Sequence, residues 1–272
     1  MKSFSSKSFS CPTPRLIAEA ADGVGVISIN NPEKRNALDL AMWRALPQLI
    51  AAMAADDAVR VIVLRGVGDS PFASGADISE FRTLRASAAG GKAYEDSNEE
   101  AFAAIAACPV PVIAMMRGFC MGGGVGIAAA CDLRVAAEGT VFGVPAARLG
   151  VGYPPQAMRL VVAAFGDAVA RDLFFTARRL DAAEAKALGA LHRLWADADL
   201  EAETMAMARA IAGNAPLAMR SAKASIAAAS GLPGSVSEAE LLALAGACFD
   251  SEDYAEGRDA FLEKRQPQFR GR

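Results

Sequence analysis

Two glycine-containing turns, each set between an apolar β-type run and a helical pattern, constrain the fold of this chain most strongly. The first is Ser70-Pro71-Phe72-Ala73-Ser74-Gly75-Ala76-Asp77-Ile78, which follows the β-branched run 59–64. The second is Gly118-Phe119-Cys120-Met121-Gly122-Gly123-Gly124-Val125-Gly126, which follows the apolar run 109–116. A strand that leads through a turn into a helix predicts a layered α/β core, with helices packed on a sheet.

The same two turns indicate a site for a negative charge. The first N–H groups of a helix have no partner within the helix, and glycine allows another group to approach the backbone closely. Two such N–H groups that meet at one point form an oxyanion hole, which stabilises an enolate or a tetrahedral oxyanion. The pair of turns therefore predicts backbone electrostatic stabilisation of an oxyanion.

Composition excludes several other classes of protein. The chain has 272 residues, 53% of them hydrophobic, which is enough for a large core. A net charge of −3 argues against a nucleic-acid or membrane-surface role, and we predict no nucleic-acid and no membrane partner. The five cysteines show no C-x-x-C pair, so reduced thiols in a cytoplasmic protein are expected.

The N-terminal half alternates between strand and helix patterns. The runs 16–20 and 24–30 flank Asp22-Gly23 and predict a β-hairpin. Asn36 is a candidate cap for the helix that follows, and Pro47 should kink that helix. A helical segment over 81–107 should break around Ala89-Gly90-Gly91.

Three regions follow from these patterns. Residues 1–14 are predicted to be a disordered tail, 15–200 an α/β core and 201–272 a helical region. His192 is the only histidine, and a single histidine is usually structural, so we predict no metal site.

Taken together, the motifs resemble those of the crotonase superfamily, the enoyl-CoA hydratase/isomerase group of acyl-CoA enzymes. The likeness runs from about Leu16 to Phe269. Besides the two turns, it rests on the following segments: Asn30-Asn31-Pro32-Glu33-Lys34-Arg35-Asn36-Ala37-Leu38, Cys131-Asp132-Leu133-Arg134-Val135-Ala136, Leu149-Gly150-Val151 and Glu256-Gly257-Arg258-Asp259-Ala260-Phe261-Leu262-Glu263-Lys264-Arg265.

The resemblance implies a core built as a spiral of ββα turns, followed by C-terminal helices that form a trimer, often doubled to a hexamer. It implies that the N–H groups of Ala76 and Gly123 hold a thioester carbonyl. Coenzyme A would enter as part of an acyl-CoA substrate, with no tightly bound cofactor. The resemblance also implies a set of residues that contact CoA: Arg35, Ala37, Ala73, Gly75, Ala76, Asp77, Ile78, Phe261 and Lys264. Of these, Phe261 and Lys264 would make their contact across a subunit boundary.

The chain departs from the hydratase pattern at two positions. Hydratases of this superfamily use two glutamates, and the matching positions here hold Gly126 and Ala146. Neither residue can transfer a proton, and a positioned acid or base contributes about 10²–10⁴-fold to a rate. Ordinary hydratase chemistry should therefore be severely impaired, and an isomerase that relies on the second carboxylate loses its base.

Other side chains could supply the missing chemistry. Tyr153 resembles the tyrosine of crotonase-type decarboxylases, and Arg148 is a second polar candidate on the same loop. A substitute base could come from an acidic cluster in the helical segment before the second turn, formed by Glu95, Asp96, Glu99 and Glu100. Three alternatives stay open: an enolate-stabilising hydratase or isomerase, a decarboxylase that uses Tyr153, and a non-catalytic acyl-CoA-binding subunit.

Overall fold

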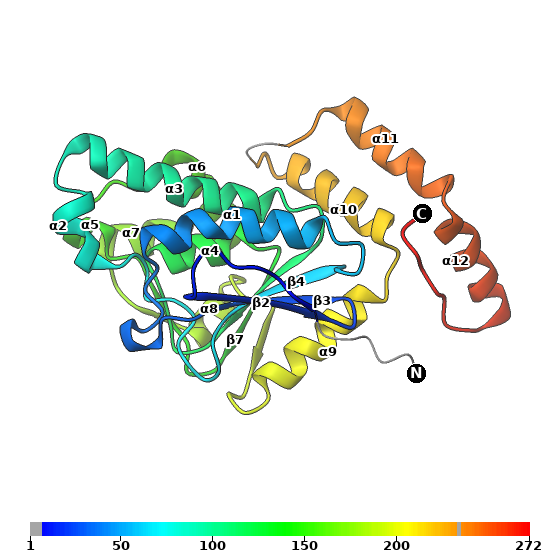
Figure 1. Cartoon of the computed structure of the whole chain (residues 1–272), viewed down its shortest axis with the longest axis horizontal. Helices are drawn as coiled ribbons and strands as arrows, with labels where there is room; N and C mark the ends of the chain where they lie inside the picture. Colours follow the sequence, from blue (N-terminus) through cyan, green and yellow to red (C-terminus); the bar gives the residue numbers. More distant parts are fainter. Residues whose placement is uncertain (1–6, 233–234) are drawn as a thin grey trace.

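The computed structural model describes residues 7–232 and 235–272. A mixed sheet forms the centre of the molecule (Figure 1). In the described part of the chain its strand order is β1-β2-β3-β4-β5-β7-β10, and β3, β4, β5, β7 and β10 run parallel. The strands are β1 (Lys7–Ser8), β2 (Leu16–Ala21), β3 (Val24–Ile29), β4 (Val61–Gly66), β5 (Val112–Met116), β7 (Leu133–Ala137) and β10 (Arg193–Trp195).

A second, smaller sheet lies beside the first at the end where the glycine turns occur. It consists of β6 (Phe119–Met121), β8 (Val141–Gly143) and β9 (Leu180–Asp181). Strand β6 runs parallel to β8, and β9 pairs antiparallel with β8. Because β6 belongs to the second glycine turn, this sheet fixes the backbone that enters helix α4.

Helices cover both faces of the main sheet. One apolar core includes Leu46, Leu64 and Phe102 and joins this sheet to α1, α3 and α4. A second core on the other face includes Val63 and Leu200 and joins the sheet to α9 (Figure 1). The helices up to this point are α1 (Leu40–Ala54), α2 (Phe81–Leu84), α3 (Ala88–Ala106), α4 (Gly123–Ala130), α5 (Ala146–Leu149), α6 (Pro155–Phe165), α7 (Asp167–Thr176), α8 (Ala182–Ala187) and α9 (Leu200–Ala212), with short 3₁₀ turns η1 (Pro32–Lys34) and η2 (Ile78–Glu80).

The last three helices extend away from this body (Figure 1). They are α10 (Pro216–Ala229), α11 (Glu238–Phe249) and α12 (Glu252–Glu263). An ion pair between Lys223 on α10 and Asp132, 2.7 Å apart, links α10 to the body, and the Asp132 carboxylate also accepts the Val112 N–H. Asp132 is therefore structural, as its place before a strand suggests.

Several predicted elements are confirmed and others are not. The hairpin forms around Asp22-Gly23, both with positive φ. Asn36 caps no helix, because it adopts φ +56° and its side chain bonds to the Asn31 N–H and the Pro71 carbonyl. Asp39 caps α1 instead, by accepting the Met42 N–H.

The predicted boundaries also shift. Of the predicted tail, residues 1–6 lie outside the described part, but Lys7–Ser8 pair with β2 and Thr13 is buried, so 7–14 is ordered. The break in the segment 81–107 falls at 85–87, before the glycines, where Ser87 caps α3. Helix α9 packs on the sheet and so belongs with the core rather than with the C-terminal helical region.

His192 has a structural role. Its Nδ1 accepts the backbone N–H of Arg134, which joins the start of β10 to β7. Burial lowers the pKa of His192 to about 4, with the nearby Arg134 charge acting in the same direction, so the ring is neutral at pH 7. Within the described residues no group of three or more His, Cys, Asp or Glu side chains could hold a metal ion. The same residues include no helix long and apolar enough to cross a membrane.

Candidate active site

The two glycine turns are joined to each other by backbone hydrogen bonds. The Ala73 N–H donates to the Phe119 carbonyl at 2.9 Å, and the Met121 N–H donates to the Ala73 carbonyl at 2.9 Å. Gly75, with φ +98°, then turns the chain so closely past this strand that an added Cβ would lie 3.0 Å from the Met121 oxygen. The first turn is therefore held directly against the strand that leads into α4.

A second set of hydrogen bonds holds the first turn from its other side. The Leu38 N–H donates to the Gly75 carbonyl, and the Asp77 N–H donates to the Leu38 carbonyl, both at 2.8 Å. Leu38 therefore bonds to Gly75 and Asp77, the residues on either side of Ala76. In a parallel bridge of this kind, the N–H of Ala76 itself points away from Leu38. The Ala76 N–H is thus fixed in direction without being used in the bridge.

The N–H groups of Ala76 and Gly123 lie side by side. A Cβ built on Gly123 would be 3.9 Å from the Ala76 nitrogen. Gly123 is the first residue of α4, so its N–H has no partner within the helix. In the described part of the chain neither N–H donates a hydrogen bond, and both residues line one pocket. The predicted pair of backbone donors is therefore brought together at a cavity.

Gly123 is required at its position by the indole of Trp43. A Cβ at residue 123 would lie 2.9 Å from two ring carbons of Trp43, which is fully buried on α1. Gly124 is under a similar constraint, because its Cβ would lie 2.8 Å from the Ala73 carbonyl oxygen. The start of α4 therefore packs so closely that a side chain at either position would force its neighbours to shift.

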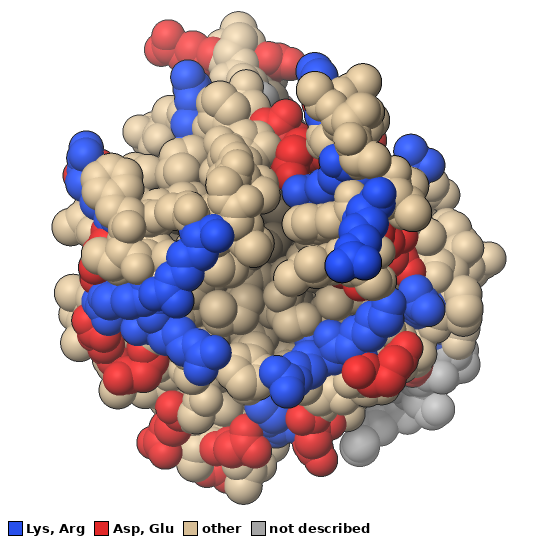
Figure 2. All heavy atoms as spheres, turned by 90° about the vertical axis from the view of Figure 1, so that its left-hand side faces the viewer, with Lys and Arg blue, Asp and Glu red and all other residues tan. Residues whose placement is uncertain are grey.

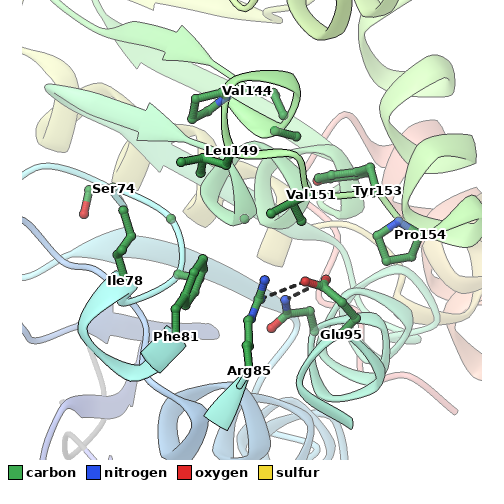
Figure 3. A pocket seen from close by; sticks show the side chains of 18 of the residues that line it. Ser74, Ile78, Phe81, Arg85, Glu95, Val144, Leu149, Val151, Tyr153 and Pro154 are labelled. Carbon is green, nitrogen blue, oxygen red and sulfur yellow. Dashed lines mark hydrogen bonds and ion pairs between the residues drawn. The ribbon is translucent and has the colours of Figure 1, made fainter. Parts of the chain in front are cut away.

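The pocket has a cavity volume of about 110 Å³ and opens between four parts of the chain. These are the first glycine turn with α2, helix α3, the start of α4, and the loop 144–154 around α5 (Figure 3). Its walls are largely apolar, and the polar side chains among them belong to Ser74, Arg85, Glu95, Asn98 and Tyr153.

Tyr153 fills the space beside Gly126. A Cβ added at Gly126 would lie 2.7 Å from the Tyr153 hydroxyl and 2.4 Å from Cζ of Phe102. The ring of Tyr153 packs edge-on against Phe174, with centroids 4.9 Å apart. The hydroxyl is buried and has no hydrogen-bond partner among the described residues. Gly126 is therefore the residue that makes room for this phenol.

The phenol of Tyr153 is a neutral donor. Burial raises its pKa well above the ordinary value, and the negative charge of Glu95 raises it further. An ionised tyrosine at neutral pH is excluded by these two effects together. Tyr153 can thus donate a hydrogen bond to a bound group, but it does not act as a base.

Glu95 is the one member of the predicted acidic cluster that lines this pocket. Its carboxylate pairs with the guanidinium of Arg85 at 2.7 Å and accepts the Asn98 Nδ2–H at 3.2 Å. Asp96, Glu99 and Glu100 line a separate surface hollow instead, and Asp96 pairs with Lys92.

The other candidate residues are placed as follows. Ala146 lines the pocket, and Arg148 is exposed on α5. Asp77 is structural: burial raises its pKa, but hydrogen bonds from Lys34 and Ser79 outweigh that effect, and the net shift is downward. Ile78 is 63% exposed at the pocket rim.

The predicted CoA contacts fall into two groups. Arg35 is exposed and its guanidinium lies 5.7 Å from the centroid of the Phe119 ring, close to the first glycine turn, whereas Ala37 and Ala73 are buried. Phe261 is 84% exposed and, with Lys264, lies at the far end of the molecule on and after α12 (Figure 1). The structure does not bring these two residues to the pocket of their own chain.

Basic side chains surround the pocket end of the molecule. Figure 2 views the end where α2 and α5 lie and shows Lys and Arg side chains on several sides of a central hollow. An anionic ligand that enters from this end would meet a favourable electrostatic potential, although the chain as a whole is slightly acidic.

Known proteins share both the sequence and this architecture. A family model described as Enoyl-CoA hydratase/isomerase matches residues 19–272. Crotonyl-CoA hydratase of Syntrophomonas wolfei is 33% identical over 260 residues, which cover 93% of this chain and 97% of that protein. The chain belongs to the enoyl-CoA hydratase/isomerase family.

Solved structures of this family confirm the crotonase fold. A structure of an enoyl-CoA hydratase/carnithine racemase from Magnetospirillum magneticum aligns with a TM-score of 0.90 at 39% identity, over 96% of this chain and 97% of that one. A structure of an enoyl-CoA hydratase from Bacillus anthracis aligns with a TM-score of 0.85 at 28% identity, over 95% of this chain and 100% of that one.

We predict that Gly126→Ala destabilises the protein by about 1–3 kcal/mol, because the added methyl group overlaps Phe102 and Tyr153. The control is Gly91→Ala inside α3, where a Cβ meets nothing within 4 Å; it should stabilise by about 0.5–1 kcal/mol through helix propensity. Urea unfolding of both variants measures the difference. A Gly126→Ala protein as stable as the wild type would show that Tyr153 does not occupy this space.

Proposed function

We propose that this chain is an acyl-CoA enzyme that stabilises a thioester enolate with the N–H groups of Ala76 and Gly123. The observation that carries the proposal is the pairing of these two unused donors at one pocket. A thioester carbonyl between them would gain negative charge as the enolate forms, and fixed donors stabilise that charge without reorganising. The N-terminal end of α4 adds a favourable dipole.

Coenzyme A would be bound as part of the substrate. Its phosphates are anionic, and the basic side chains at the pocket end of the molecule provide a complementary surface (Figure 2). Arg35 is the candidate nearest the first glycine turn, and the backbone of residues 73–78 would lie against the nucleotide. The residues Arg35, Ala37, Ala73, Gly75, Asp77 and Ile78 remain proposed contacts on this basis.

The C-terminal helices support the proposal of a homo-oligomer, a trimer or a hexamer. Large apolar side chains are exposed on α10–α12, including Ile226, Leu242, Phe249 and Leu262, each at least 65% exposed. Exposed apolar surface of this kind is typical of a protein–protein interface. Phe261 and Lys264 would then reach the CoA of a neighbouring subunit rather than their own.

Decarboxylation is the reaction that the polar side chains lining the pocket support best. Gly126 and Ala146 offer no carboxylate, and Glu95 is held by two donors, so within the part of the chain that the structure describes no unpaired carboxylate lines the pocket. In a malonyl-type thioester the bond between Cα and the carboxylate breaks, CO₂ leaves, and the electron pair passes into the enolate held by Ala76 and Gly123. The neutral phenol of Tyr153 would orient the carboxylate by donating a hydrogen bond, and the enolate would then take up a proton at Cα from solvent water.

Replacement of Gly123 tests the oxyanion hole. Gly123→Pro removes the N–H, whereas Gly123→Ala keeps it, and both add the Cβ that meets Trp43. We expect kcat/KM of the proline variant to be about 10²–10³-fold below that of the alanine variant. The wild-type protein is first assayed for malonyl-CoA decarboxylation and for crotonyl-CoA hydration, and the variants are compared in the reaction that it catalyses. Thermal melting checks that both variants are folded. Equal rates in the two folded variants would remove Gly123 from the mechanism.

Replacement of Tyr153 tests the reaction type. We expect wild-type protein to release CO₂ from malonyl-CoA faster than it hydrates crotonyl-CoA, and Tyr153→Phe to lower the decarboxylation rate by roughly 10²-fold, the cost of losing one well-placed donor. Chromatography of acetyl-CoA and the absorbance of crotonyl-CoA measure the two reactions. Rapid hydration that Tyr153→Phe leaves unchanged would contradict decarboxylation, and tight binding without either reaction would support a non-catalytic subunit.

A further inference from the structure

We propose that Tyr94 and Glu80 are positioning residues for the oxyanion hole, which together clamp the backbone of residues 38–40 and so set the direction of the Ala76 N–H. The inference rests on the proposed acyl-CoA function and goes beyond it, since it adds two residues that would not touch the substrate. In the described part of the chain, neither side chain belongs to the pocket wall. Both would act through the backbone that they hold.

Leu38 is the residue through which the clamp acts. Its N–H donates to the Gly75 carbonyl at 2.8 Å. The Gly75 carbonyl and the Ala76 N–H belong to the same planar peptide group and point in opposite directions, as in every trans peptide. A bond at the carbonyl end therefore fixes the direction of the N–H at the other end. Any movement of Leu38 would rotate the donor of the oxyanion hole.

Tyr94 holds Leu38 from the side of helix α3. Its hydroxyl donates to the Leu38 carbonyl at 3.2 Å, and this oxygen also accepts the Asp77 N–H. The Tyr94 side chain is 1% exposed and lies in the core that joins α1 and α3 to the sheet. Burial raises its pKa well above the ordinary value, and the charge of Glu80 acts in the same direction, so the phenol stays a neutral donor at pH 7. Leu38 is thereby tied to a helix as well as to the turn.

Glu80 holds the other end of the same segment. Its Oε2 accepts the Leu40 N–H at 2.9 Å. Leu40 is the first residue of α1, so its N–H has no partner within the helix, and a carboxylate at this position also complements the helix dipole. Glu80 ends η2, which directly follows Asp77. Its bond therefore joins the end of the first glycine turn to the start of α1.

The two side chains act on one short stretch of irregular backbone. Apart from the bridge at Leu38, residues 37–39 belong to no helix or strand. Tyr94 and Glu80 bond to main-chain groups only two residues apart within or beside this stretch. A donor that stabilises an enolate must be fixed before the reaction, and a misplacement of about 1 Å can cost about 10²-fold in rate. The clamp provides this rigidity on the Ala76 side of the hole.

The carbonyl signal of a bound thioester tests the clamp. Butyryl-CoA labelled with ¹³C at the thioester carbon is observed free and bound to wild-type, Tyr94→Phe and Glu80→Ala proteins, with thermal melting to check folding. We expect a smaller downfield shift on binding in both variants, because a less well-aligned Ala76 N–H polarises the carbonyl less. In the reaction that the wild type catalyses, kcat/KM should fall about two- to tenfold, the net effect of one lost hydrogen bond.

Two further variants separate positioning from general stability. Glu80→Gln keeps an oxygen that can accept the Leu40 N–H, so it should recover the wild-type shift. Thr204→Val is the matched control for Tyr94→Phe. The Thr204 hydroxyl is also buried and donates to a backbone carbonyl, that of Leu200 at 2.6 Å, but it lies on α9 at the other face of the sheet. This variant should keep the wild-type carbonyl shift even if its melting temperature falls.

The outcomes distinguish the clamp from the proposed function. A wild-type shift in folded Tyr94→Phe or Glu80→Ala protein removes that residue from the clamp, while the oxyanion hole stands. A shift that shrinks equally in Thr204→Val would also overturn the clamp, because the loss of any buried hydrogen bond would then suffice. If wild-type protein binds butyryl-CoA without moving the carbonyl signal, the oxyanion hole itself is wrong.

Discussion

The backbone connection between the two glycine turns is the constraint on which the site depends. Ala73 pairs with the strand that enters α4, and Leu38 pairs with the turn from the opposite side. Together these bonds use the neighbouring backbone groups and leave the N–H groups of Ala76 and Gly123 unused and adjacent. Because the donors are backbone atoms, their positions follow from the fold and do not depend on side-chain rotamers.

Around this fixed pair, the polar side chains that line the pocket are neutral or paired. Gly126 lacks a side chain and the Tyr153 hydroxyl occupies the adjacent space. Glu95 lies at the pocket but is bound by Arg85 and Asn98. Among the described residues, the one carboxylate that lines this pocket is therefore paired.

The sequence predicted those features that backbone patterns determine. The hairpin, the α/β core and the two glycine turns follow from alternation and turn residues, and the resemblance to the crotonase superfamily then pointed to Ala76 and Gly123 within the turns. Asn36 was misplaced because Asn36 and Asp39 are both good cap residues, and the choice between them depends on the hydrogen bond from Asn36 to the distant Pro71 carbonyl. Arg85 and Asn98 carried no signal, since one ends a short helix and the other lies within a polar stretch, and their burial arises only from tertiary packing.

The most direct test of the account is the carbonyl signal of a bound thioester. Butyryl-CoA labelled with ¹³C at the thioester carbon can be observed by NMR, free and bound to wild-type protein. The account predicts a downfield shift of this carbonyl on binding, because two N–H donors polarise it, and a smaller shift in Gly123→Pro than in Gly123→Ala. A bound signal at the same position as that of the free thioester would contradict the assignment of Ala76 and Gly123 as an oxyanion hole.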